Sequence, residues 1–358
     1  MNSPARNRPL DVLRGAAILL VLGRHLPQAV TLIPGFLGDF YRIWYRIGWS
    51  GVDLFFVLSG FLVSGLLFKE YRENGAVRAK RFILRRGLRI WPAFYLMIAL
   101  SVAFTWKTVR PDQIFSEVFF IQNYSTHPPM WVHTWTLAVE EHFYLLLAGI
   151  LWLLAKRSGP NPFKAVPFLW LGASIGCLWY RFITPYYLGR VFMPTHARLD
   201  ALLFGVMLAY FHHFQGKDLK AAVRRRWPWL LLAAAAGLSP IFRADLETSP
   251  FISRLGMTFT YLSYGMLLLV AVLAVPESKK TSPLEKFFIF IGIRSYSIYL
   301  WHFPVAWILV RPLSMAIDES ISLGWAIAIY LTGAILVGCL SYRYIEQPIL
   351  RWRDRHLL

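Results

Sequence analysis

The feature that most constrains the fold of this chain is a series of apolar runs, each about 20 residues long, that recur along its whole length. Hydrophobic residues make up 57% of the 358 residues, and the mean hydropathy is +0.47. A helix of this length crosses the hydrocarbon core and satisfies its own backbone hydrogen bonds there. We therefore predict an all-α, polytopic membrane bundle of about ten transmembrane helices around a polar cavity. The predicted spans are residues 10–30, 49–68, 88–106, 133–155, 164–183, 196–214, 227–242, 254–275, 287–310 and 321–343.

The basic residues indicate how these spans are oriented. The chain has 38 lysines and arginines against 19 acidic residues, and most of the basic residues fall in alternate loops. This distribution follows the positive-inside rule and predicts that both termini are cytoplasmic. It also argues against a nucleic-acid-binding surface, because the charge is not gathered in one patch. Residues 1–343 are then one transmembrane domain, and residues 344–358 form a basic amphipathic tail at the inner leaflet lipids.

Residues 11–25 carry charge inside an apolar run. Arg14 and His25 are eleven residues apart, which is about three helical turns and places both on one face. Asp11 precedes Arg14 by one turn. The predicted span 10–30 would hold His25 near the middle of the bilayer. Because ionisable residues are costly there, these positions are candidates for a functional site.

Arginines also cluster before the third predicted span. Arg86 and Arg89 are three residues apart and project together from a helix. Two guanidinium groups at a membrane interface suit bidentate binding of phosphate. They would equally serve as a topology signal that faces anionic lipid, and the pattern alone leaves both readings open.

The span 133–155 contains two adjacent carboxylates, Glu140 and Glu141, which point about 100° apart on a helix and should have separate roles. His133, Thr136, Glu140 and Tyr144 form one stripe along this helix. In the span 49–68, Asp53 lies near one end and needs a partner. Small residues near Gly60 allow close helix packing.

Three later positions complete the polar set. Arg198 and Asp200 open the span 196–214 and either pair with each other or line a cavity. Tyr299 and His302 share a face of the span 287–310, where His302 is either functional or bonded between helices. Glu346 is expected to pair with a nearby arginine, and Pro348 to end the last helix.

Taken together, these residues resemble the acyltransferase 3 family of bacterial integral membrane acyltransferases. The matching motifs occur in family order across nearly the whole chain. They are Asp11-x-x-Arg14 with His25, the Gly51–Leu62 segment, Arg86-x-x-Arg89 with Pro92, Trp135-x-Leu-x-x-Glu140-Glu141-x-Phe-Tyr144, Arg198-x-Asp200, Tyr299-x-Trp-His302 and Glu346-x-Pro348.

The resemblance implies an enzyme of the bacterial cytoplasmic membrane. Members move an acyl group, usually acetyl, from cytoplasmic acetyl-CoA to a hydroxyl, so the donor is a substrate and no cofactor or metal is permanently bound. Their acceptors include lipopolysaccharide O-antigen, peptidoglycan, exopolysaccharide and macrolides. Some members carry an extracytoplasmic SGNH domain. We expect none in this chain, so the membrane domain completes the transfer or passes the acyl group to a separate extracytoplasmic partner protein.

On this basis we assign roles to the motif residues. His25 has an ordinary pKa near 7 and suits general-base work on a hydroxyl, with Glu140 as the candidate group that orients it. Arg14, Arg86 and Arg89 would hold the phosphates of coenzyme A. The residues expected to line the substrate cavity are Asp11, Asp53, Glu141, Tyr144, Arg198, Asp200, Tyr299 and His302.

Several alternatives stay open from the sequence. The acceptor is a cell-envelope glycan or a small natural product, the acyl group is acetyl or longer, and transfer is direct or through a covalent intermediate. Ionisable residues near the bilayer midplane also fit a transporter. A non-catalytic scaffold is the other alternative, and it would tolerate replacement of His25. Loops 31–48, 107–132 and 184–195 should shape the acceptor site. Trp44, Trp49 and Trp131 would stack on sugars or form an interfacial aromatic belt, and we favour the belt.

Overall fold

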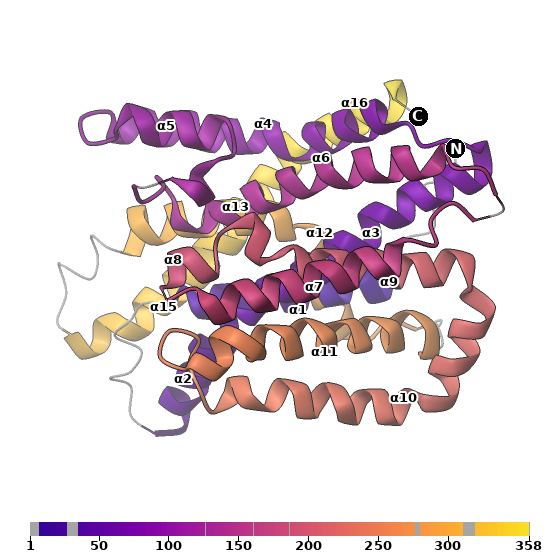
Figure 1. Ribbon diagram of the computed structural model, residues 1–358. Helices are drawn as coiled ribbons and strands as arrows, with labels where there is room; N and C mark the ends of the chain where they lie inside the picture. The colour runs from indigo at the N-terminus through magenta and orange to yellow at the C-terminus, as the bar shows by residue number, and fades with distance from the viewer. Residues whose placement is uncertain are drawn as a thin grey trace.

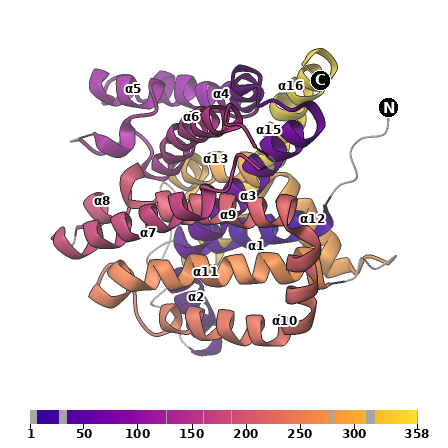
Figure 2. The same cartoon turned by 45° about the vertical axis from the view of Figure 1, so that its right-hand side comes forward.

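The computed structural model describes residues 7–26, 35–125, 127–159, 161–185, 187–275, 280–310 and 319–357. Within these ranges the chain is helical and contains no strand. The long helices run alongside one another as a bundle (Figures 1 and 2). The all-α fold class expected from the apolar runs is therefore confirmed.

The first half of the bundle consists of long helices joined through short ones. Its α-helices are α1 (Arg8–Arg24), α2 (Gly35–Gly48), α3 (Ser50–Asn74), α4 (Ala79–Thr105), α5 (Pro111–Val118) and α6 (Trp135–Ala155). Two 3₁₀ turns, η2 (Gln122–Tyr124) and η3 (Val132–Thr134), lead into α6.

The described second half contains α-helices of 4 to 23 residues and several single turns of π-helix. Its α-helices are α7 (Val166–Ile183), α8 (Leu188–Val191), α9 (Leu199–Phe214), α10 (Gly216–Leu238), α11 (Met257–Leu269), α12 (Pro283–Ile293), α13 (Ser295–Val305), α15 (Glu319–Ser341) and α16 (Gln347–His356). The π turns are η6 (Ile252–Gly256), η7 (Val270–Ala274), η8 (Ala306–Val310) and η9 (Tyr342–Glu346), and the 3₁₀ turns are η4 (Thr195–Ala197) and η5 (Ser239–Phe242).

Six helical segments of the described chain are long and apolar enough to cross a membrane. They are Ser50–Asn74, Ala79–Thr105, Val132–Ala155, Val166–Ile183, Ile252–Ala274 and Gly324–His356. The described parts of the other four predicted spans are also mainly helical, but their helices are too short, too polar or too interrupted to cross a membrane by length and composition. The described residues thus form an all-helical structure with six candidate membrane crossings, and the count of ten crossings stays a prediction.

Two predicted spans differ in the structure. Helix α1 ends at Arg24 with His25 as its C-cap, whereas the predicted span continued to residue 30. Residues 27–34 lie outside the described residues. The predicted span 287–310 is divided at Arg294, which ends α12 and begins α13.

The C-terminal segment also corrects an expectation. Pro348 does not end the last helix, because it lies in the first turn of α16. A proline is tolerated there, since the first N–H groups of a helix have no partner within the helix. The π turn η9 joins α15 to α16, and Glu346 within it lies 3.9 Å from Arg89 Nη2. The expected partner of Glu346 is therefore an arginine, as predicted.

Helix α3 is the most buried of the six segments, because 72% of its most apolar stretch lies inside the protein. It packs against α9 through glycines that face backbone. A methyl group on Gly60 would lie 2.0 Å from the Leu202 carbonyl oxygen, and one on Gly205 would lie 2.2 Å from the Val57 carbonyl oxygen. The small residues expected near Gly60 thus bring two helices into close contact.

Replacing Gly60 with alanine is expected to push α3 and α9 apart and to lower stability by about 1–3 kcal/mol, the usual cost of overpacking. Gly149 in α6 provides a matched control, because a methyl group there meets no atom within 4 Å. We expect Gly149→Ala to be neutral or slightly stabilising. Thermal unfolding of the purified variants in detergent measures both effects, and equal melting temperatures would contradict the packing argument.

The loop before α6 is held against that helix by a buried carboxyl group. Thr134 Oγ1 donates to Glu117 Oε1 at 3.0 Å, and Gln122 Nε2 donates to the Thr134 carbonyl oxygen at 3.0 Å. Burial raises the pKa of Glu117 to about 8, so this carboxyl group is largely protonated at neutral pH. A neutral side chain costs less to bury than a charge, which suits a structural role.

The short helices α2, α5 and α8 gather at one end of the bundle (Figure 1). The beginning of α1 and the whole of α16 lie at the opposite end (Figures 1 and 2). Two cavities in the bundle are lined by some of the motif residues.

Candidate functional site

The first cavity, which we call the arginine cavity, lies among α1, α3, α4, α6 and α13 and has a volume of about 100 Å³. Arg14, Arg86 and Arg89 line it together. Their sequence positions are far apart, so the fold brings α1 and α4 together to form the cluster. The other polar residues on its wall are Ser59, Thr136, Glu140, Tyr144, Ser295, Tyr296 and Tyr299.

The three arginines of this cavity differ in their partners. Arg14 Nη1 lies 3.3 Å from Asp11 Oδ1, and Arg89 Nη2 lies 3.9 Å from Glu346 Oε1. The guanidinium carbon of Arg86 is 5.8 Å from the centre of the Tyr144 ring. Three guanidinium groups and one carboxylate, Glu140, line this narrow space, so its wall carries more positive than negative charge, which is the environment that binds phosphate groups.

The predicted stripe on α6 is present. Tyr144 Oη donates to Glu140 Oε2 at 3.0 Å and lies 2.8 Å from Ser59 Oγ of α3. Glu141 points elsewhere, because its Oε2 accepts a hydrogen bond from Trp91 Nε1 at 3.2 Å. The two adjacent carboxylates therefore have separate environments, as their angular separation predicts.

The second cavity, which we call the histidine cavity, has a volume of about 430 Å³. That volume lies within the usual range of small-molecule sites, roughly 300–1,000 Å³. Its polar and aromatic wall residues are Arg24, His25, Tyr45, Trp49, His133, Trp135, Phe192, Glu247, Tyr299 and Phe303. Tyr45, Val132 and Met193 belong to the three loops expected to shape the acceptor site, and each contributes to the wall.

Three imidazole rings meet at this cavity. His302 Nε2 lies 3.1 Å from His25 Nδ1, and the ring centres of His133 and His302 are 4.8 Å apart. Phe303 stacks on His133 at an interplanar angle of 3°. The rings are therefore held in place by packing as well as by hydrogen bonds.

The hydrogen bonds assign the tautomers of neutral rings. His302 Nδ1 contacts the Tyr299 carbonyl oxygen, which only accepts, so Nδ1 carries the hydrogen and Nε2 accepts. His25 Nδ1 then donates, which agrees with its distance of 3.1 Å to the Val21 carbonyl oxygen. The Nε2 atom of His25 is left with a lone pair, as a general base requires.

Glu140 does not lie beside His25. It lines the arginine cavity, whereas His25 lines the histidine cavity. The side chain that contacts His25 Nδ1 is that of His302. The structure thus replaces the predicted Glu140–His25 pairing with a pair of histidines from α1 and α13.

The two cavities share two wall residues, Val52 of α3 and Tyr299 of α13. Tyr299 Oη donates to the His133 carbonyl oxygen at 2.6 Å and lies 2.6 Å from Thr136 Oγ1. Thr136 is also on the wall of the arginine cavity. A thin layer of side chains therefore separates a cationic cavity from one that contains a base.

Several residues expected on a cavity wall form buried ion pairs instead. Arg198 Nη2 contacts Asp53 Oδ1, and Arg181 Nη2 lies 2.7 Å from Asp200 Oδ2. All four side chains are at most 1% exposed. Arg198 and Asp200 do not pair with each other, as one prediction had it, because each binds a charge on another helix. Arg198 lies behind the cavity wall, 4.7 Å from the centre of the Phe192 ring.

Comparison with known proteins identifies the family to which this arrangement belongs. A family model described as an acyltransferase domain matches residues 7–343. This chain belongs to the acyltransferase 3 family. The family expected from the motifs is thus confirmed, and the match covers both cavities of the acyltransferase domain.

Curated relatives of this acyltransferase domain include two O-acetyltransferases. The peptidoglycan O-acetyltransferase OatA of Listeria monocytogenes is 29% identical over 374 residues, which cover 95% of this chain and 55% of that protein. The O-acetyltransferase OatA of Staphylococcus aureus strain NCTC 8325 is 29% identical over 374 residues, which cover 98% of this chain and 58% of that protein. The chain therefore spans a little more than half the length of these relatives. No solved structure matches the chain.

The acyltransferase domain also contains wall residues that the sequence did not single out as a set. Arg24, Glu247 and Trp49 line the histidine cavity. Trp49 is only 3% exposed and Trp131 only 8% exposed, so the favoured interpretation of an interfacial belt is wrong for these two. Trp44 is partly buried and donates to the Leu19 carbonyl oxygen at 2.8 Å. Composition could not reveal this, because a belt and a cavity wall use the same residue types.

Among the residues predicted to line the cavity, Tyr144 and Tyr299 are on a cavity wall. The others lie behind a wall in hydrogen bonds or ion pairs, namely Asp11, Asp53, Glu141, Arg198, Asp200 and His302. These six residues therefore support the shape of the acyltransferase domain, and His302 does so next to the proposed base.

Proposed function

We propose that this domain is a membrane O-acetyltransferase that moves an acetyl group from acetyl-CoA to a hydroxyl of a cell-envelope glycan. The observation that carries this proposal is the wall shared by the two cavities, formed by Val52 and Tyr299. An anionic donor suits the arginine cavity, and a hydroxyl acceptor suits the cavity that contains His25. The names of the two relatives, one of them a peptidoglycan O-acetyltransferase, support a glycan as acceptor.

In the proposed reaction, the acceptor hydroxyl oxygen attacks the thioester carbonyl carbon. His25 Nε2 takes the hydroxyl proton as the new C–O bond forms. The C–S bond then breaks, and the proton passes to the thiolate of coenzyme A. His302 keeps His25 in the tautomer that exposes the lone pair of Nε2, since its own Nε2 accepts from His25 Nδ1. Direct transfer of this kind needs no covalent enzyme intermediate.

We further propose that the arginine cavity opens toward the cytoplasm, where acetyl-CoA is found. In this arrangement the domain crosses the bacterial cytoplasmic membrane ten times, with both termini inside, as the basic loops predict. The beginning of α1 and the end of α16 lie at one end of the bundle, which agrees with this arrangement (Figure 1).

The function is tested by release of coenzyme A from the purified protein in detergent. We expect release to require both acetyl-CoA and a soluble glycan such as chitotetraose, and the glycan to gain one acetyl ester by mass spectrometry. Release without an acceptor would indicate hydrolysis or an acyl-enzyme. Absence of release, together with movement of an intact solute across proteoliposomes, would favour a transporter instead.

The donor side predicts a difference between two neighbouring arginines. Arg86 lines the arginine cavity, whereas Arg85 lies 3.8 Å from Asp354 of α16 and takes no part in the cavity wall. We expect Arg86→Gln to raise the KM for acetyl-CoA by about 10–150-fold, since one charge-assisted phosphate contact contributes about 1.5–3 kcal/mol. Arg85→Gln should leave KM unchanged, and equal effects of the two variants would contradict the phosphate assignment.

A further inference from the structure

Two buried polar atoms on the wall of the histidine cavity have no hydrogen-bond partner among the described residues. They are Trp49 Nε1 and His133 Nδ1. The two residues are 3% and 2% exposed. His133 Nε2 lies 3.1 Å from the Leu300 carbonyl oxygen and must donate to it, so Nδ1 has a lone pair and accepts. Because buried polar atoms are nearly always paired, this wall offers one donor and one acceptor to a ligand.

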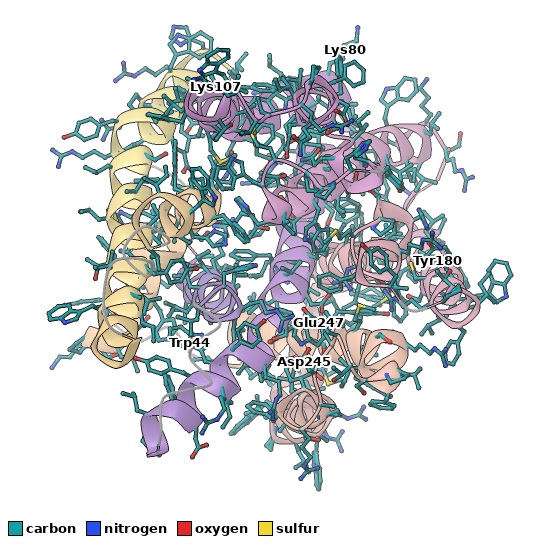
Figure 3. All side chains as sticks on the ribbon, turned by 90° about the vertical axis from the view of Figure 1, so that its left-hand side faces the viewer. Trp44, Lys80, Lys107, Tyr180, Asp245 and Glu247 are labelled. Atoms are coloured by element: carbon teal, nitrogen blue, oxygen red, sulfur yellow. The ribbon has the colours of Figure 1, made fainter. Side chains whose placement is uncertain are left out.

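A carboxylate on the same wall is fixed by an arginine. The Arg24 guanidinium contacts Glu247, lies 3.5 Å from Asp245 Oδ2, and stacks 4.6 Å from the centre of the Tyr45 ring. The Arg24 side chain is 11% exposed, whereas the Glu247 side chain is 52% exposed. Figure 3, in which the left-hand side of Figure 1 faces the viewer, shows Asp245 and Glu247 next to each other near the centre of that view. Arg24 therefore holds a carboxylate at the cavity.

The charge of this group differs in sign from that of the arginine cavity. Two carboxylates surround one guanidinium here, so the group is net negative and should repel phosphate or carboxylate ligands. Hydroxyl and amide groups both donate and accept hydrogen bonds, and they match the combination of Trp49 Nε1, His133 Nδ1 and the Glu247 carboxylate. An uncharged sugar has these groups together with an apolar ring face.

We propose that Trp49, His133 and Glu247 form the binding subsite for an uncharged sugar residue of the acceptor, and that Arg24 is a positioning residue for Glu247. This inference rests on the proposed acetyl transfer. Arg24 directly precedes His25, and both line the same cavity. A sugar held at this subsite therefore has a hydroxyl beside the proposed base.

The subsite is tested by binding, without any donor. Radiolabelled chitotetraose, an uncharged N-acetylated glycan, is titrated into the purified full chain in detergent. We expect Trp49→Phe and Glu247→Gln each to weaken binding about tenfold, the effect of losing one hydrogen bond of about 1.4 kcal/mol. Glucose 6-phosphate is an anionic sugar, so a fourfold excess of it should displace little of the radiolabelled chitotetraose.

Two matched variants show whether weaker glycan binding comes from the subsite or from a loss of folded protein. Trp44 has the same side chain as Trp49, but its Nε1 already donates to Leu19, so Trp44→Phe should bind chitotetraose like the wild type. Asp112 is a surface carboxylate on α5 bonded to Arg110, and Asp112→Asn should also bind normally. Melting temperatures of all four variants are compared with the wild type to confirm folding.

The outcomes distinguish the subsite from the reaction. If Trp49→Phe and Glu247→Gln bind chitotetraose as tightly as Trp44→Phe and Asp112→Asn, or if the wild type does not bind it at all, the subsite is wrong. That result leaves His25-dependent release of coenzyme A to be judged by its own assay. If binding depends on Trp49 and Glu247 but no coenzyme A is released, the subsite stands and the acetyl transfer is contradicted.

Discussion

Replacement of His25 by alanine is expected to slow acceptor-dependent release of coenzyme A by about 10²–10⁴-fold, the usual contribution of a general base. The loss should fall on kcat, while the KM for acetyl-CoA stays near the wild-type value. The reason is spatial, because His25 lines the histidine cavity and the proposed phosphate-binding arginines line the other cavity. Steady-state kinetics at varied acetyl-CoA concentration measure both quantities.

A histidine outside the cavities provides the control for this variant. His356 lies exposed on α16, where its ring stacks 4.8 Å from that of Trp352. His356→Ala should therefore keep full activity. If His25→Ala is folded, as judged by its melting temperature, and retains activity within a few-fold of His356→Ala, then His25 is not the base.

The parts of the site that follow from helix geometry could be predicted from the sequence. The bond between Asp11 and Arg14 and the stripe from His133 to Tyr144 depend only on residues three or four positions apart. The choice of Arg86 and Arg89 as a pair that faces one cavity follows in the same way. The spacing of residues along a helix determines which side chains share a face, so pairs of this kind can be predicted from the sequence.

The parts that depend on neighbours in the bundle could not be predicted. Arg24 and Glu247 are 223 positions apart, and His25 and His302 are 277 positions apart. Nothing in the local pattern of α1 selects a histidine of α13 over Glu140 of α6 as the partner of His25. The same applies to Trp49, whose ring packs edge-on against that of Phe192, a residue far away in the sequence.

The length of the helices was the other point on which the sequence was misleading. Hydropathy predicts an apolar run, but it does not show where a helix ends within that run. Arg294 divides one predicted span into α12 and α13, and α1 ends at Arg24 where the chain approaches the histidine cavity. Both helix ends position side chains of the candidate site. Helix α1 stops beside α13, and this brings His25 and His302 into contact.

Asp53→Asn is expected to destabilise the protein by about 3–5 kcal/mol, because it leaves the Arg198 charge buried without its partner. Both side chains are at most 1% exposed, and the neighbouring pair of Arg181 and Asp200 is equally buried. The four charges sum to zero, so the loss of one leaves a net charge in the interior. Unfolding in detergent, followed by fluorescence, measures the change in free energy.

A double variant shows that the effect comes from an unpaired charge and not from a lost contact. Asp53→Asn combined with Arg198→Met removes both charges, and it should be much more stable than the sum of the two single variants predicts. The exposed pair of Asp39 and Arg42 on α2, whose side chains are 65% and 35% exposed, is the control. Asp39→Asn should cost less than about 1 kcal/mol. If Asp53→Asn cost no more than Asp39→Asn, or if the double variant showed simple additivity, the loss of stability would not come from an unpaired buried charge.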